Sequence, residues 1–175
     1  FVLPNPFFVM ATQNPIEQLG TYNLPEAQLD RFLYKILVRY PSLEEEALIL
    51  QTNITTNNFD DFNLAPVIDP DEILRLQELV KQIKAESKIE RYIVRLVDAT
   101  RNPKTYRIEL GKYIGYGASP RSSISLYSAS KARALVNGRG FVTPTDVKGV
   151  AHNVLRHRVL LNFEGEAEEI APDAI

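Results

Sequence analysis

The sequence contains no cysteine and no tryptophan, and only 2 of its 175 residues are histidine. Without cysteine, disulfide bonds, thiolate metal sites and cysteine nucleophiles are excluded, and two histidines are too few for a dedicated zinc site. The absence of cysteine also fits an intracellular protein. The chain also has no large excess of either charge, because it contains 20 Lys and Arg and 22 Asp and Glu. The net charge of −2 gives no overall field that would attract nucleic acid or an anionic membrane.

Glycine is sparse, with 8 residues in the whole chain. No two of them have the G-x-x-x-x-G-K-[ST] spacing that surrounds a phosphate with backbone N–H groups, so the chain carries no P-loop. The chain opens on Phe1, and its apolar segment 6–11 has no basic segment before it and is too short to span a bilayer. We therefore expect neither a signal peptide nor a membrane helix, and we interpret the chain as part of a longer protein that begins within a domain.

Residues 1–52 have the pattern of an α/β fold. Continuous apolar runs at 7–11 and 32–38 predict two buried strands. Residues 25–31 predict a short helix with Pro25 in its first turn, and Ser42 and Glu45 form a capping box for a helix that ends near residue 51. Strands that alternate with helices are typical of an α/β sheet. Residues 53–66, rich in Asn, Asp and Thr, predict a linker.

Residues 67–175 predict a small all-α domain. Four segments begin with a capping residue and continue with apolar side chains at helical spacing. Their starts are Asp69-Pro70, Ser87, Ser119-Pro120 and Thr143-Pro144. Glu72 and Glu90 complete capping boxes for the first two helices, and Gly138 ends the third. Four amphipathic helices with short connections predict a helical bundle.

Asn14 is the first candidate for chemistry. It follows the predicted strand 7–11, at the carboxyl end where α/β sheets bind their ligands, and its amide could orient a water molecule or a phosphate oxygen. Asn14-Pro15 also suits the start of a turn, in which the side chain binds nearby backbone. The residues alone leave both roles open.

Arg121 is the second candidate, because its place in the first turn of a predicted helix is electrostatically unfavourable for a cation. A bound anion would offset that cost. The free N–H groups of the helix, Arg121 and the hydroxyls of Ser119, Ser122 and Ser123 are expected to converge on one point, which would form a phosphate site. The alternative is an arginine that extends into solvent or pairs with an acidic residue elsewhere.

Arg31 is the third candidate. It follows Asp30 at the end of the predicted helix 25–31, where a cation is also compatible with the helix dipole, so a purely structural role is open. The remaining cations of the C-terminal part are scattered among acids and lack interleaved aromatic residues, which gives little support to a nucleic-acid surface. They are Lys131, Arg133, Arg139, Arg156 and Arg158.

Several motifs together resemble the MoxR family of AAA+ ATPases. The first is Phe8-Val9-Met10-Ala11-Thr12-Gln13-Asn14-Pro15-Ile16-Glu17, followed by Gly20-Thr21-Tyr22 and by Leu24-Pro25-Glu26-Ala27-Gln28-Leu29-Asp30-Arg31-Phe32. It is similar to the sensor 1 and arginine-finger region of that family. The later Gly117-Ala118-Ser119-Pro120-Arg121 resembles its sensor 2 motif, and the segment from Ala132 to Arg158 resembles its helical lid.

The resemblance implies a role for each candidate. Asn14 would be sensor 1, which helps to place the attacking water, and Arg31 would be the arginine finger that reaches the nucleotide site of a neighbouring subunit. Arg121, with Ser119 beside it, would be the sensor 2 group that contacts the nucleotide phosphates of its own subunit. The implied fold is the α/β remnant of an AAA+ core, made of its C-terminal strands and helices, followed by an all-α helical lid.

The chain departs from the family pattern in one respect, since the P-loop and the Walker B acidic pair are both absent. ATP and Mg²⁺ are therefore expected as cofactors of the intact protein, while the chain alone should bind no cofactor tightly and hydrolyse no ATP. The missing strands of the core should also leave a sheet edge exposed, which predicts association or instability of the chain alone.

The resemblance further implies a cytoplasmic, chaperone-like ATPase that assembles into a hexameric ring and acts on other proteins, among them proteins with a von Willebrand factor A domain. We expect neither a membrane nor nucleic acid as a partner. Two alternatives from other classes stay open: a stand-alone helical interaction module without nucleotide chemistry, and a helical domain that binds nucleic acid.

Overall fold

The computed structural model describes residues 2–13, 24–52 and 62–175. Within these ranges the chain is mainly helical, and its helices follow the expected order, from the predicted α/β remnant to the helical bundle. The predicted linker 53–66 lies mostly outside the described residues, so the domain boundaries stay predictions. Among the described residues, no helix combines the length and the apolar character that crossing a membrane requires.

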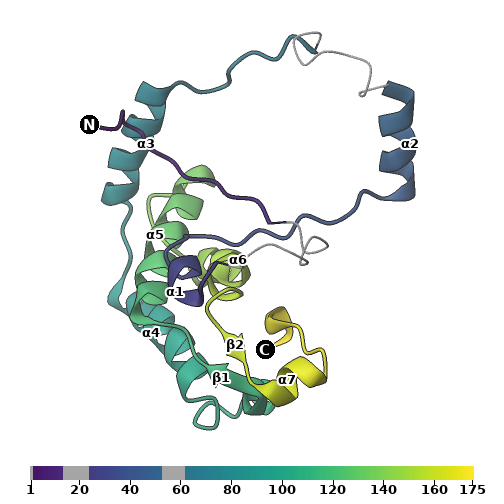
Figure 1. The fold of residues 1–175 in the computed structure, drawn as a ribbon. Coiled ribbons are helices and arrows are strands. Elements are labelled where there is room, and N and C mark those ends of the chain that lie inside the picture. Colours follow the sequence, from purple (N-terminus) through teal and green to yellow (C-terminus); the bar gives the residue numbers. More distant parts are fainter. Residues whose placement is uncertain (1, 14–23, 53–61) are drawn as a thin grey trace.

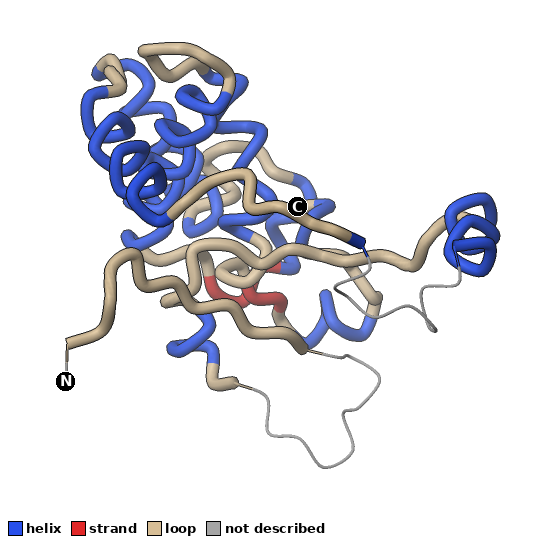
Figure 2. The backbone as a smooth tube through the Cα atoms, turned by 90° about the horizontal axis from the view of Figure 1, so that it is seen from above, coloured by secondary structure: helices blue, strands red, loops and turns tan. Residues whose placement is uncertain are grey.

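The N-terminal part contains two helices, α1 (Glu26–Leu29) and α2 (Leu43–Thr52). The helix predicted at 25–31 is thus shorter than expected. The capping box predicted for the second helix is confirmed, because the Ser42 amide donates to the Glu45 carboxylate at 2.8 Å and the Glu45 amide donates to Ser42 Oγ at 3.3 Å. Both views of the backbone show α2 standing apart from the other helices (Figures 1 and 2).

The two strands predicted at 7–11 and 32–38 are wrong for the structure described, where both segments are extended but belong to no strand. A strand needs a neighbour with which to form a hydrogen-bonded ladder, and neither segment has one among the described residues. Most of their apolar side chains are correspondingly exposed, with Phe8 and Met10 each 81% and Val38 93% accessible, although Tyr34 packs against the core. The apolar runs therefore predict buried segments, but the described elements leave most of their side chains exposed.

The C-terminal part is built on α3 (Pro70–Gln82), α4 (Ser87–Arg101), α5 (Pro120–Val136) and α6 (Pro144–Leu155). The Asp69–Glu72 capping box is confirmed. The box predicted from Ser87 and Glu90 is wrong, because the helix starts at Ser87 itself and Glu86 becomes the N-cap residue. The predicted stop at Gly138 is confirmed, and its φ of +69° is a conformation that suits glycine.

The core lies between α4, α5 and α6. The apolar stripes predicted from helical spacing supply it: Val97, Leu126, Val147 and Val154 are fully buried. Alanine and serine on α5 have small side chains, which allows this helix to pack closely against its neighbours. The turn between α5 and α6 is held by Asp146, which accepts hydrogen bonds from the Arg139 side chain at 2.6 Å and from the backbone N–H of Thr143 at 2.8 Å.

A small antiparallel sheet closes the bundle at one end (Figure 1). The 3₁₀-helix η2 (Glu109–Tyr113) leads into β1 (Ile114–Tyr116), which pairs with β2 (Leu160–Leu161). The short α7 (Phe163–Ala167) and the 3₁₀-helix η3 (Pro172–Ala174) follow. The pairing of β1 with β2 connects the segment before α5 to the segment after α6, where residues 156–158 lie.

Candidate functional site

The segment before α5 is fixed against the C-terminal end of α4. The backbone N–H of Ala118 donates to Thr100 Oγ1 at 2.9 Å, and Arg101 Nε donates to the Ala118 carbonyl at 2.8 Å. Gly117 permits this approach, because a Cβ at that position would lie 2.5 Å from the carbonyl oxygen of Thr100. These contacts fix the segment before α5. They therefore also fix the start of α5 and the position of Arg121 in its first turn.

Asp30 is the centre of the candidate site. Its carboxylate accepts a hydrogen bond from Arg121 Nη1 at 2.6 Å, from Arg158 Nε at 2.9 Å and from Ser119 Oγ, which lies 3.1 and 3.2 Å from the two carboxylate oxygens. Burial would raise the pKa of Asp30, but the hydrogen bonds from Arg158, Ser119 and Arg121 outweigh burial and hold that pKa below its ordinary value. Asp30 is therefore an anion that joins α5 to the end of α1.

The structure brings Ser119 and Arg121 together, and it shows their shared partner to be a carboxylate of the same chain. The expectation that Ser122 joins them is wrong: its side chain is fully buried, and Ser122 Oγ has no hydrogen-bond partner among the described residues. Successive residues on a helix point about 100° apart, so Arg121 and Ser122 face different directions. The Arg121 side chain is 51% exposed and so has access to solvent and to ligands.

Arg31 lies in the turn that follows α1 and is exposed. Within the described residues its side chain makes no hydrogen bond and no ion pair. The carbonyl oxygens on either side of it, those of Asp30 and Phe32, both accept hydrogen bonds from Arg158. The backbone on both sides of Arg31 is thus held by Arg158, while the Arg31 side chain is exposed.

Arg158 is the functional candidate that the sequence did not indicate. It was expected to be one of several scattered surface cations, yet its side chain is 1% exposed. Burial lowers the pKa of Arg158, and the hydrogen bond and charge of Asp30 act in the opposite direction. One signal in the sequence could have suggested its burial: Arg158 stands directly before the apolar run Val159-Leu160-Leu161.

The two histidines have different partners. His157 is buried and its Nε2 lies 3.1 Å from the Phe32 carbonyl, whereas His152 Nδ1 lies 3.9 Å from Asp173. Burial, together with the nearby charge of Arg158, lowers the pKa of His157. His157 therefore adds a hydrogen bond to the contacts that hold residues 30–33 against the segment after α6. Asn14, the remaining predicted site residue, lies outside the described residues.

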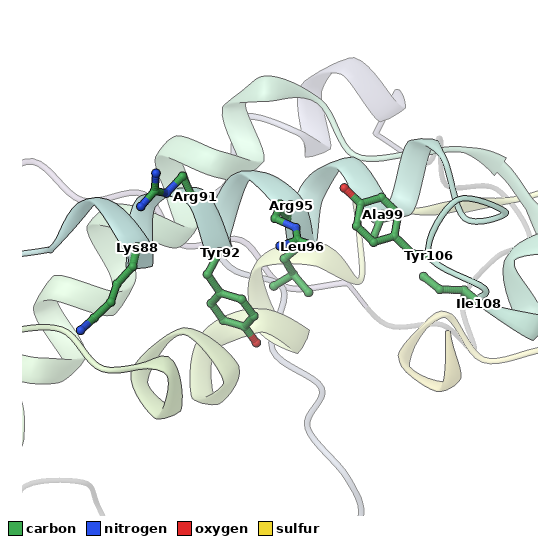
Figure 3. Close-up of a pocket in the computed structure, with 8 residues that line it drawn as sticks. All are labelled: Lys88, Arg91, Tyr92, Arg95, Leu96, Ala99, Tyr106 and Ile108. Carbon is green, nitrogen blue, oxygen red and sulfur yellow. The ribbon is translucent and has the colours of Figure 1, made fainter.

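A shallow groove of about 580 Å³ lies elsewhere, along α4 (Figure 3). Lys88, Arg91 and Arg95 line it together with Tyr92 and Tyr106. None of the predicted site residues belongs to this groove. It is thus separate from the cluster of charges around Asp30.

Comparisons with known proteins agree with the resemblance. Residues 110–175 match the sequence model of the AAA lid domain, and residues 1–34 match that of the ATPase family associated with various cellular activities (AAA). The chain is 42% identical to the chaperone MoxR1 of Mycobacterium tuberculosis, over all of this chain and 46% of that protein. It is also 42% identical to the uncharacterised protein YeaC of Bacillus subtilis, over 99% of this chain and 51% of that protein.

The fold is likewise similar to a solved structure. The crystal structure of a protein from Cytophaga hutchinsonii that is assigned as an ATPase superposes with a TM-score of 0.89 at 41% identity, over 99% of this chain and 52% of that one. The chain therefore spans about half the length of the relatives that it matches. Similarity of sequence and of fold over its whole length leads to one assignment: the chain belongs to the MoxR family of AAA+ ATPases.

Proposed function

We propose that this chain supplies the sensor residues, the arginine finger and the lid of a MoxR-type ATPase whose intact form hydrolyses ATP. The observation that supports the proposal is the contact of Ser119 and Arg121 with Asp30, the residue directly before Arg31. In this proposal Arg121 and Ser119 bind nucleotide phosphates within a subunit. Arg31 acts in the neighbouring subunit and Asn14 orients the attacking water.

The donor chemistry of the lid fits a nucleotide phosphate. Arg121 is half exposed in the first turn of α5, where the helix dipole and a guanidinium both favour an anion. Its present partner, the Asp30 carboxylate, shows that the position accepts a negatively charged oxygen. ATP would supply the phosphoryl group, and in the proposal Mg²⁺ is held by the P-loop and Walker B motifs of the parent protein, since the described residues contain no group of three metal-ligating side chains.

The proposal extends to the assembly. A finger that acts in a neighbouring subunit requires a ring, for which we propose a hexamer, and the relative named a chaperone suggests protein clients. Proteins with a von Willebrand factor A domain are the client class we propose, in the cytoplasm. The chain alone, which lacks a P-loop, is proposed to hydrolyse no ATP.

The test uses the intact parent protein, with ATP turnover and ATP affinity measured separately. Arg31→Ala should lower turnover by about 10³- to 10⁵-fold, because a finger neutralises charge that develops in the transition state, while ATP affinity stays nearly unchanged. Arg39→Ala, a change at an exposed arginine of the same segment, is the matched control and should leave turnover intact. Wild-type turnover in Arg31→Ala would contradict the finger assignment.

Arg121→Ala is expected to behave differently, since its proposed contact is with the nucleotide of its own subunit. It should weaken ATP binding, whereas mixing the variant with subunits that have an intact Arg121 and an inactive P-loop should not restore turnover. The same mixture should rescue Arg31→Ala, because the partner subunits supply fingers. Rescue of both variants, or of neither, would contradict the assigned geometry.

A further inference from the structure

We propose that Arg158 is a positioning residue for Arg31, so that the helical lid helps to fix the arginine finger. This inference rests on the proposed function, because it assumes that Arg31 acts in a neighbouring subunit. Its basis is one contact pattern: Arg158 Nη2 donates to the carbonyl oxygen of Asp30 at 3.0 Å and to that of Phe32 at 2.6 Å. These are the two residues that flank Arg31.

Arg158 is itself held in place from several sides. Its Nη1 donates to the Val154 carbonyl at 2.6 Å, its Nε to the Asp30 carboxylate at 2.9 Å and its Nη2 also lies 3.3 Å from Ser125 Oγ. Val154 belongs to α6 and Ser125 to α5, so both helices anchor the guanidinium. A planar guanidinium has five N–H donors in a fixed fork and can bond several of these acceptors together, whereas a lysine ammonium has three donors and no planar fork.

The backbone around Arg31 is also held by α1. The N–H of Arg31 donates to the Gln28 carbonyl at 3.1 Å, and that of Phe32 donates to the Leu29 carbonyl at 3.0 Å. Residues 32–35 make further contacts with the lid. The Leu33 carbonyl lies 3.3 Å from Arg158 and the Phe32 carbonyl lies 3.1 Å from His157. The Lys35 N–H donates to the Asn153 carbonyl at 2.8 Å, and the Lys35 carbonyl accepts from Arg156 at 2.9 Å. Among the described side chains, that of Arg158 contacts the backbone carbonyls on both sides of Arg31, so we expect the direction in which Arg31 leaves the backbone to depend on it.

The experiment isolates the finger from every other activity of the subunit. Donor subunits of the full-length parent carry an inactivated P-loop, so they contribute only their finger, and acceptor subunits carry Arg31→Ala with an intact P-loop. ATP turnover of the mixed ring then reports how well the donor presents Arg31. Any effect of Arg158 on the donor's own nucleotide site is not measured, because that site is inactive.

Donors with Arg158→Lys should restore turnover about 10- to 100-fold less well than unaltered donors, since misplacement of a catalytic group by about 1 Å costs up to roughly that much. The loss should appear in kcat, with the KM for ATP of the acceptor unchanged. Arg156→Lys is the matched control: Arg156 is also largely buried and bonds Asp173 and the Lys35 carbonyl, but it makes no contact with the residues flanking Arg31. This control donor should restore full turnover.

Thermal melting and ring assembly of each donor are measured in parallel. If Arg158→Lys does not assemble, Asp30→Asn donors replace it, because this change removes the charge that pairs with Arg158 Nε while leaving both flanking carbonyls in place. The ATP turnover restored by Asp30→Asn donors should be about 3- to 10-fold lower than with unaltered donors. Direct loss of the carbonyl contacts would cause a larger decrease. Full restoration by an assembled Arg158→Lys donor, or by the Asp30→Asn donor in its place, overturns the inference.

Failure of the proposed function would give a different result in the mixing experiment. Donors that themselves carry Arg31→Ala would then restore turnover as well as unaltered donors, or no donor would restore any. If only donors with an intact Arg31 are active and Arg158→Lys donors equal them, the finger assignment stands and the positioning role of Arg158 is wrong.

Discussion

The ion pair between Asp30 and Arg158 gives the sharpest prediction about stability. Asp30→Asn keeps the shape of the side chain but removes the negative charge beside an arginine whose side chain is 1% exposed. Removing one partner of a buried ion pair costs about 3 to 5 kcal/mol, because the other charge stays buried without compensation. Here Asp30 is 22% exposed, and Arg158 keeps its bonds to backbone carbonyls, which reduces the penalty.

We therefore expect Asp30→Asn to lower the free energy of unfolding by roughly 2 to 3 kcal/mol. Loss of the second ion pair of Asp30, with the half-exposed Arg121, adds at most about 1 kcal/mol to this decrease. The measurement is urea unfolding followed by circular dichroism. Glu78→Gln is the control, since Glu78 pairs with Lys81 at 2.6 Å while both side chains are about two-thirds exposed, and its loss should stay below about 0.5 kcal/mol.

The same pair predicts a dependence on pH. The pKa of Asp30 is lower in the folded than in the unfolded protein, so its contribution is fully present above the unfolded value of about 3.9 and is lost as the pH falls through the folded value. The difference between wild type and Asp30→Asn should shrink below about pH 4. Equal stability of Asp30→Asn and Glu78→Gln at neutral pH would refute the reasoning.

Two further predictions concern residues around the site. Burial lowers the pKa of His157, so folding stability should fall as the pH drops below about 6.5, and His157→Gln should remove this slope in pH-dependent thermal melting while the exposed His152→Gln keeps it. Gly117→Ala should cost about 1 to 3 kcal/mol in urea unfolding, because its Cβ would lie 2.5 Å from the Thr100 carbonyl oxygen, whereas Gly140→Ala has open space and should be nearly neutral. Equal effects of His157→Gln and His152→Gln, or of Gly117→Ala and Gly140→Ala, would contradict the packing described.

The helices could be predicted from the sequence because their signals are local. Asp69 and Glu72 form their capping box across three residues, and Gly138 ends α5 through its own backbone conformation. The predicted strands were wrong for the opposite reason. An apolar run such as 32–38 indicates that the segment is buried against something, but a ladder requires a partner strand, and the described residues supply none.

The candidate site could be predicted only in part. Arg121 was singled out because its position at a helix start is locally unfavourable, and the structure pairs it with an acidic residue of the same chain, which is the alternative that the sequence left open. The identity of the anion could not be predicted, because Asp30 is separated from Arg121 by most of the chain. Arg158 was missed for the same reason: its burial results from contacts with residues more than 120 positions away.

In the proposal, these long-range contacts connect the lid to the segment that carries Arg31. Arg121 and Arg158 both bind Asp30, and Arg158 also binds the backbone on each side of Arg31. If Arg121 leaves Asp30 to bind a phosphate, Asp30 keeps its bond to the buried Arg158, so the carboxylate stays compensated and the exchange costs little. The loss of one exposed ion pair would then release the lid from one of its attachments to the segment that carries Arg31, while Arg158 keeps that segment in place.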